Sequence, residues 1–142
     1  MTFSDPAMVQ FFKDGLKEMI GGGIDLLFCN EEEAMLFADT DKLEDAISFM
    51  KTQAKTFAIT LGNKGAIAFD GTTTHVIEAN ATTAVDSNGA GDMFAGAFMY
   101  AITHGHDFAA AGRLASAASS QVVSQFGPRL EAEQHEPLKA VL

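Results

Sequence analysis

Helix-like and strand-like patterns alternate along this chain, and this alternation restricts the fold more than any other feature. The helix-like segments carry apolar side chains every three or four positions, whereas the strand-like segments are short, nearly continuous apolar runs. In chain order they are residues 6–20 (helix), 24–29 (strand), 31–38 (helix), 41–54 (helix) and 56–61 (strand). This order predicts a parallel sheet whose strands are joined by crossover helices.

A hairpin continues the pattern. Residues 66–69 and 74–78 are strand-like, and the turn signal Asp70-Gly71 lies between them. Two strands joined so closely must pair antiparallel. We therefore expect an α/β fold, a three-layer α/β/α sandwich with a mostly parallel sheet and an antiparallel hairpin addition.

The first two long helices are each expected to bury one side. The apolar stripe of the first helix consists of Val9, Phe12, Leu16, Met19 and Ile20. Pro6 suits the first helical position, and Asp41 is expected to cap the helix that follows it. Both helices are therefore predicted to pack on the sheet through one face.

Composition limits what this fold can bind. A chain of 142 residues with 47% hydrophobic side chains is long and apolar enough for one domain with a real core. The net charge of -10, with only nine Lys and Arg residues, argues against nucleic acid and anionic membranes as partners, because both are bound through clustered basic side chains. A phosphate group would have to be bound by backbone amides and a divalent metal ion.

The single cysteine and the absence of targeting signals indicate the compartment. Cys29 lies in an apolar run, where a small buried residue is expected, and it excludes an intramolecular disulfide. No apolar run reaches the roughly 18 residues that a membrane-spanning helix requires, and the start has no basic-then-apolar signal region. The expected setting is the soluble, reducing cytoplasm.

Residues 86–92, Asp-Ser-Asn-Gly-Ala-Gly-Asp, are the strongest candidate for chemistry. Two glycines two positions apart precede an apolar run with helical spacing, which describes a loop whose amides open onto a helix N-terminus. The free N–H groups and the helix dipole at such an end suit a phosphate or a developing phosphoryl charge. Asp92 lies in this first turn, where its plainer alternative role is that of a helix cap.

This string resembles the signature of the ribokinase-like (PfkB) family of carbohydrate and nucleoside kinases, Asp-Thr-x-Gly-Ala-Gly-Asp at the start of a helix. Ser87 stands where the family usually has Thr and keeps the hydroxyl. The resemblance implies that Asp92 is the general base that takes the proton of the acceptor hydroxyl. It also implies that the amides of Gly89, Ala90, Gly91 and Asp92 form the anion hole for the transferred phosphoryl group.

A second motif follows the first strand. Asn30-Glu31-Glu32-Glu33 can be read as ordinary helix-start electrostatics, because three acids in a first turn suit the helix dipole. The segment also resembles the Asn-x-x-Glu motif of the same family. By that resemblance, Asn30 lies near the nucleotide phosphates, and Glu33 orients a magnesium ion through water.

Three further segments are similar to nucleotide-binding segments of this family. The run from Thr60 through Gly62 to Gly65 resembles its Thr-x-Gly-x-x-Gly segment, which borders the nucleotide. The small-residue helix 108–123 resembles one that lies along the adenine, with Ser116 at a position that often carries Asn. Gly127 aligns with a glycine that binds a monovalent cation such as K⁺ together with the loop near Asp86.

The resemblance covers nearly the whole chain but corresponds only to the C-terminal half of a family member, which is roughly twice as long. We therefore expect residues 1–142 to be the nucleotide-binding, catalytic portion, without the N-terminal substrate and lid half. The expected ligands are ATP, Mg²⁺ and a nucleoside or sugar, with adenosine favoured because residues 86–92 and 125–129 are most similar to adenosine-kinase-type members. Little turnover is expected from this chain alone, and an exposed sheet edge would favour association, including a homodimer.

Other functions remain as alternatives. A dinucleotide-binding domain built on Gly89-Ala90-Gly91 would need a third glycine that is misplaced here, and no Gly-x-x-x-x-Gly-Lys-Ser/Thr string of a P-loop occurs. The main alternative is a noncatalytic remnant that keeps a nucleotide-shaped groove and acts through a partner.

Overall fold

The computed structural model describes the whole chain, Met1–Leu142. Its centre is a sheet of four strands in the order β1-β2-β3-β4. The strands are β1 (Ile24–Asn30), β2 (Ala54–Thr60), β3 (Ala66–Phe69) and β4 (Thr74–Ile77). The helices are α1 (Pro6–Ile20), α2 (Glu31–Ala38), α3 (Leu43–Gln53), the short 3₁₀ helix η1 (Gly62–Lys64), α4 (Ala90–Thr103), α5 (Phe108–Val123) and α6 (Ala132–Lys139).

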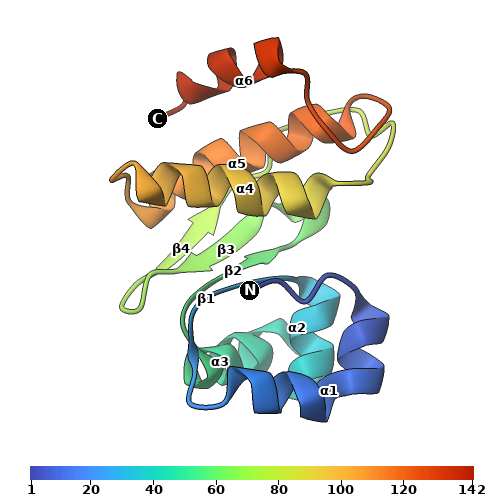
Figure 1. Cartoon of the computed structure of the whole chain (residues 1–142), viewed down its shortest axis with the longest axis vertical. Helices are drawn as coiled ribbons and strands as arrows, with labels where there is room; N and C mark the ends of the chain where they lie inside the picture. The colour runs from blue at the N-terminus through green and yellow to red at the C-terminus, as the bar shows by residue number, and fades with distance from the viewer.

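The helices cover both faces of the sheet, so the predicted α/β sandwich is confirmed. Figure 1 shows α1, α2 and α3 on one face, α4 and α5 on the other, and α6 on the outer side of α4 and α5. β1 and β2 are parallel, and a single parallel bridge from Thr2 to Phe28 extends that part of the sheet. The pairings of β2 with β3 and of β3 with β4 are antiparallel, which gives the predicted hairpin addition. Only one of the three strand pairings is parallel, so the sheet is mixed rather than mostly parallel as predicted.

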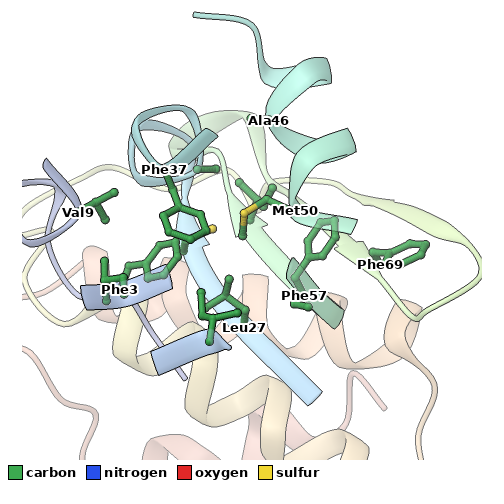
Figure 2. Packing of buried hydrophobic residues seen from close by; sticks show 14 residues of the cluster. Phe3, Val9, Leu27, Phe37, Ala46, Met50, Phe57 and Phe69 are labelled. Atoms are coloured by element: carbon green, nitrogen blue, oxygen red, sulfur yellow. The ribbon is translucent and has the colours of Figure 1, made fainter. Parts of the chain in front are cut away.

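The alternating side chains of β1 and β2 divide the core in two. Leu27 and Cys29 point to the face covered by α1, α2 and α3, while Phe28 between them packs toward α4 and α5. Figure 2 shows the first cluster, in which Phe37 of α2 and Met50 of α3 pack over the strands. Cys29 is buried in this core, as predicted, and its burial raises the pKa of the thiol.

The second cluster depends on small side chains of the sheet. Ala58, Ala66 and Ala68 let the large side chains of α4, such as Phe98, reach the sheet surface. Gly112 brings α5 even closer, because a Cβ atom there would lie 2.4 Å from Ile77 Cδ1. These contacts fix the position of α5 relative to β4, and thereby one wall of the site described below.

Two details of the first helices differ from prediction. Val9, Leu16 and Ile20 are buried in α1, but Phe12 and Met19 are 59% and 73% exposed. The predicted stripe was wider than the face that reaches the sheet, and the helical backbone is interrupted at Phe12 (φ −122°, ψ 22°). At α3 the N-cap residue is Lys42, with no side-chain cap, so Asp41 does not cap this helix.

No helix of the chain combines the length and the apolar character that crossing a membrane would require.

Candidate active site

A pocket of about 490 Å³ lies between the turn after β2, the segment that joins β4 to α4, and the facing sides of α4 and α5. We call it the neutral pocket, because none of its lining residues is charged. Five of the residues predicted to bind a nucleotide line it: Thr60, Gly62, Gly65, Gly91 and Ser116. Segments from four separate parts of the chain are therefore brought together around one cavity.

Glycine is required in the turn that borders this pocket. Gly65 has φ +96°, and a Cβ atom there would lie 2.0 Å from the carbonyl oxygen of Ile77 on β4. The turn is closed by the N–H of Leu61, which donates to the carbonyl of Gly65 at 2.8 Å. Gly65 therefore allows the turn to pass directly against the backbone of β4.

Asp86 holds the turn of the loop before α4 and links this loop to the segment after α5. One carboxylate oxygen accepts from the N–H of Asn88 at 3.0 Å, and the other accepts from the N–H of Gly127 at 3.2 Å. Gly89 has φ +77°, and an added Cβ would lie 2.4 Å from the carbonyl oxygen of Pro128. Asp86 and Gly127, which sequence analysis paired as a candidate cation site, are thus neighbours in the fold.

The head of α4 exposes fewer free donors than the sequence suggested. The N–H of Ala90 donates to the carbonyl of Ser87 at 3.3 Å, because the loop makes a tight turn there. The N–H groups of Gly89, Gly91 and Asp92 have no acceptor within the chain. A helix N-terminus with three free amides can bind an anion, and the amide of Ala90 is used in holding the loop.

Asp92 is exposed at the first turn of α4 and opens to a different hollow from its neighbour Gly91. This second hollow, the α6 pocket, measures about 540 Å³ and lies between α4, α5 and α6. Its lining includes Tyr100 and the basic side chains of Arg129 and Lys139. The carboxylate of Asp92 is therefore accessible, and it lies at the boundary between the two hollows.

Asn30 and Glu33 form a capping box at the start of α2. The N–H of Glu33 donates to Asn30 Oδ1 at 2.8 Å, and the N–H of Asn30 donates to Glu33 Oε2 at 2.9 Å. Neither side chain lines the neutral pocket, although Asn30 pairs in register with Thr60, which does. Burial, with smaller contributions from Asp5 and Glu32, raises the pKa of Glu33, while the bond from Asn30 opposes this.

The carboxylates do not gather into a ready-made metal site. No group of three or more His, Cys, Asp or Glu side chains lies close enough to hold a metal ion. Glu33 Oε1 accepts no hydrogen bond within the chain, so this oxygen is free to accept from a water molecule. That arrangement fits a Mg²⁺ ion held through water better than one coordinated directly by protein side chains.

Among the polar residues of the neutral pocket that were not predicted from the sequence, Asn80 and Ser119 make hydrogen bonds to other segments of its lining. The side chain of Asn80 donates to Ser116 Oγ at 3.0 Å, and Ser119 Oγ donates to the carbonyl of Ala90 at 3.0 Å. Ser119 follows Ser116 by three positions on α5, so the helical spacing of serines was a usable signal. Nothing in the local sequence around Asn80 marks it, because its partner is 36 positions away.

Sequence comparison shows that this chain is similar to carbohydrate and nucleoside kinases. A sequence model of the pfkB family of carbohydrate kinases matches residues 1–135. The chain is 34% identical to the ribokinase of Lactococcus lactis over 104 residues, which cover 73% of the chain and 34% of that relative. It is 32% identical to adenosine kinase 1 of Arabidopsis thaliana over 142 aligned residues, covering 89% of the chain and 41% of that relative.

Solved structures of kinases superpose on the whole length of this chain. A probable sugar kinase of Rhizobium etli CFN 42 superposes with a TM-score of 0.92 at 32% identity, covering 100% of this chain and 44% of that one. An adenosine kinase of Sinorhizobium meliloti superposes with a TM-score of 0.93 at 26% identity, again covering 100% of this chain and 44% of that one. The chain therefore spans less than half the length of the proteins it matches.

Proposed function

Because this chain belongs to the pfkB family of carbohydrate kinases, we propose that it is the nucleotide-binding, phosphoryl-transferring portion of a nucleoside or sugar kinase. The reaction moves the γ-phosphoryl group of ATP to a primary hydroxyl of the acceptor. The observation that carries this proposal is the neutral pocket with the head of α4 at its edge. An uncharged cavity that ends at free backbone amides suits a nucleotide whose phosphates are bound without lysine.

In this proposal the amides of Gly89, Gly91 and Asp92 stabilise the phosphoryl group during transfer. Charge builds up on its oxygens in the transition state, and fixed N–H donors at the positive end of a helix stabilise that charge without rearrangement. Ala90 contributes by bonding Ser87, which holds the loop in shape.

Asp92 acts as the general base. As the acceptor oxygen bonds to phosphorus and the bond to the leaving ADP breaks, the hydroxyl proton passes to the carboxylate of Asp92. A helix N-terminus stabilises the ionised carboxylate and makes it a weaker base. Proton removal is therefore a late event, when the acceptor oxygen is already bonding to phosphorus.

The proposed metal ions are held near the two other motifs. Glu33 would hold a Mg²⁺ ion through water, with Asn30 beside the phosphates, and the ion would neutralise phosphate charge. The contact between Asp86 and Gly127 supports a monovalent cation such as K⁺ at the base of the loop.

The acceptor class follows from the relatives. The matched proteins include a ribokinase and adenosine kinases, so both sugars and nucleosides are candidates. We favour adenosine, because residues 86–92 and 125–129 are most similar to adenosine-kinase-type members. The coverage of less than half of each relative supports a second proposal, a noncatalytic nucleotide-binding chain that acts through a partner.

Titration of this chain with ATP and Mg²⁺ tests the proposal. Gly91→Val should abolish binding, because the added side chain enters the neutral pocket, while its Cβ meets no atom within 4 Å and leaves the backbone undisturbed. Gly96→Val is the matched control, since Gly96 lies in the same helix, has equal free space and does not line that pocket. Equal ATP binding by both variants would contradict the proposed site.

Asp92→Asn separates the kinase from the noncatalytic alternative. In a full-length kinase that contains this portion, the variant should bind ATP normally but lose most of its turnover, because an amide cannot accept the proton. Unchanged turnover would remove Asp92 from the role of base. A pH–rate profile of the same protein would show whether proton transfer limits the reaction.

A further inference from the structure

The neutral pocket contains a polar pair that the roles above leave unused. Asn80 Nδ2 donates to Ser116 Oγ at 3.0 Å, and Ser116 Oγ donates to the carbonyl oxygen of Glu78 at 2.9 Å. Both Asn80 and Ser116 line the pocket. Ser116 is 9% exposed, and its hydroxyl already has one donor and one acceptor as partners. A ligand would therefore meet Asn80 rather than the hydroxyl of Ser116.

These bonds fix the orientation of the Asn80 side chain. Its nitrogen faces Ser116, because the hydroxyl of Ser116 already donates to the Glu78 carbonyl and is left to accept from Asn80. If Oδ1 and Nδ2 exchanged positions, Ser116 could bond Asn80 only by giving up its bond to Glu78. Oδ1 and the second N–H of Nδ2 have no partner within the chain. A carboxamide held in this way presents one acceptor and one donor side by side in a set order.

This pair lies away from the phosphate end of the pocket. Ser119 Oγ bonds the carbonyl of Ala90 at the head of α4, where the phosphates are proposed to bind. Ser116 lies three residues before Ser119, which is about 4.5 Å along the helix axis. On the pocket side of α5, Ser119 therefore lies next to the head of α4, and Ser116, one turn earlier, lies next to Asn80.

We propose that Asn80, positioned by Ser116, reads the nucleotide base and selects adenine over guanine. This inference rests on the proposed function. Adenine has a donor at N6 beside an acceptor at N7 or N1, whereas guanine has an acceptor at O6 in place of the N6 donor. A carboxamide with a fixed orientation can accept from adenine N6 and donate to the neighbouring ring nitrogen. Against guanine, the same oxygen would face O6, and neither of these two oxygens has a proton to donate. A carboxamide free to rotate can pair with either base.

Ser116→Ala gives the diagnostic result, because it frees the Asn80 amide without removing it. Calorimetric titrations with ATP, GTP and inorganic tripolyphosphate, each with Mg²⁺, measure binding to base and phosphates separately. The wild-type chain should bind ATP about tenfold or more tightly than GTP, the discrimination expected of one paired base edge. In Ser116→Ala, the ratio of GTP to ATP dissociation constants should fall toward one because GTP binds more tightly. General damage to the pocket cannot produce such a gain in affinity.

Two further variants complete the test. Asn80→Ala should lower the ratio through weaker ATP binding and leave tripolyphosphate binding unchanged. Ser124→Ala is the control, since Ser124 Oγ bonds only Gln121 of its own helix at 2.8 Å and does not line the pocket, so the ratio should stay at its wild-type value. Equal binding of ATP and GTP by the wild type, or an unchanged ratio in Ser116→Ala, overturns this inference alone. Absence of any nucleotide binding overturns the proposed function and this inference with it.

Discussion

Glu33 is the only acidic side chain that the fold buries, with 3% of its surface exposed. Burial raises its pKa, and repulsion from Asp5 and Glu32 adds to this, although the bond from the N–H of Asn30 favours the ionised form. Ionisation of Glu33 therefore costs the folded protein stability. A capping residue alone would not require this charge, which supports the proposed role of Glu33 toward a metal ion.

Glu33→Gln should stabilise the chain at neutral and higher pH, because the amide can still accept from Asn30 without carrying a charge. A pKa raised in the folded state means that the ionised form destabilises the fold above that pKa, and that the penalty disappears as pH falls through it. The Tm of Glu33→Gln should exceed that of the wild type at pH 8, and the gain should shrink as the pH is lowered toward the ordinary glutamate value of 4.5. Thermal unfolding followed by circular dichroism measures both values.

Glu44→Gln is the matched control for this experiment. Glu44 occupies the first turn of α3 and is exposed, so its replacement should give no gain at either pH. A Glu33→Gln variant that is less stable than the wild type at pH 8 would show that the ionised carboxylate of Glu33 does not destabilise the fold.

Helix α1 has apolar residues on two sides, of which one is buried and the other is exposed. Val9, Leu16 and Ile20 pack on the sheet, and Lys13 pairs with Asp39 at the end of α2. At 100° per residue, Met19 falls on the flank that faces away from α2, where it is 73% exposed. Sequence periodicity alone could not separate the two sides, because both carry apolar residues at helical spacing.

Leu16→Ala should therefore lower the free energy of unfolding by about 2–5 kcal/mol, the usual range for a buried leucine. Met19→Ala in the same helix should change it by less than about 0.5 kcal/mol. Urea unfolding at two protein concentrations measures both variants. A large, concentration-dependent loss in Met19→Ala would mean that this flank is covered by another molecule in solution.

The β3–β4 hairpin depends on Asp70. Its carboxylate accepts from the N–H groups of Thr72 and Thr73 at 2.8 and 2.7 Å and lies 2.8 Å from the ring of His75. These partners, with Thr73 the largest contributor and His75 next, lower the pKa of Asp70 to about 2. The turn thus contains a carboxylate that stabilises the fold only while it is ionised.

A lowered pKa in the folded state gives stability that is present above the unfolded value and is lost as pH falls. The contribution of Asp70 should therefore be constant above pH 3.8 and decline from there to about pH 2. The Tm difference between wild type and Asp70→Asn, measured across this range, should shrink toward acid. A Tm difference that does not vary with pH would show that the stabilising effect of Asp70 does not depend on its charge.

The whole molecule presents one incomplete sheet edge. Beyond β1, residues 1–3 contribute the bridge from Thr2 to Phe28 and a bond from the Met1 amino group to the Leu26 carbonyl at 2.9 Å, but no full strand. The matched proteins are more than twice as long as the part they share with this chain. We therefore propose that residues 1–142 form the nucleotide-binding portion of the kinase, and that the acceptor is bound mainly by chain outside it.

The 142-residue chain by itself should then bind ATP but show little or no turnover with adenosine or ribose, because the acceptor is not held against Asp92. A coupled ADP-release assay with each acceptor measures turnover, and light scattering after size exclusion shows whether the open edge causes association. Robust phosphorylation of either acceptor would prove this prediction wrong.

The amino-acid sequence determined the elements, the α/β class and the loop at the head of α4, because each depends on local signals. Apolar spacing distinguishes helix from strand, and glycine marks the turn at Gly65 and the left-handed position at Gly89. The same local reading found five nucleotide-binding candidates that line the neutral pocket, which are Thr60, Gly62, Gly65, Gly91 and Ser116.

Tertiary structure alone decided which donors stay free and which side chains meet. The amide of Ala90 is occupied by Ser87, Asp92 opens to the α6 pocket, and Asn80 is held by a serine 36 positions away. Hydrogen bonds across such distances depend on strand register and on how closely α5 approaches β4. These are properties of the packed core, and no local pattern encodes them.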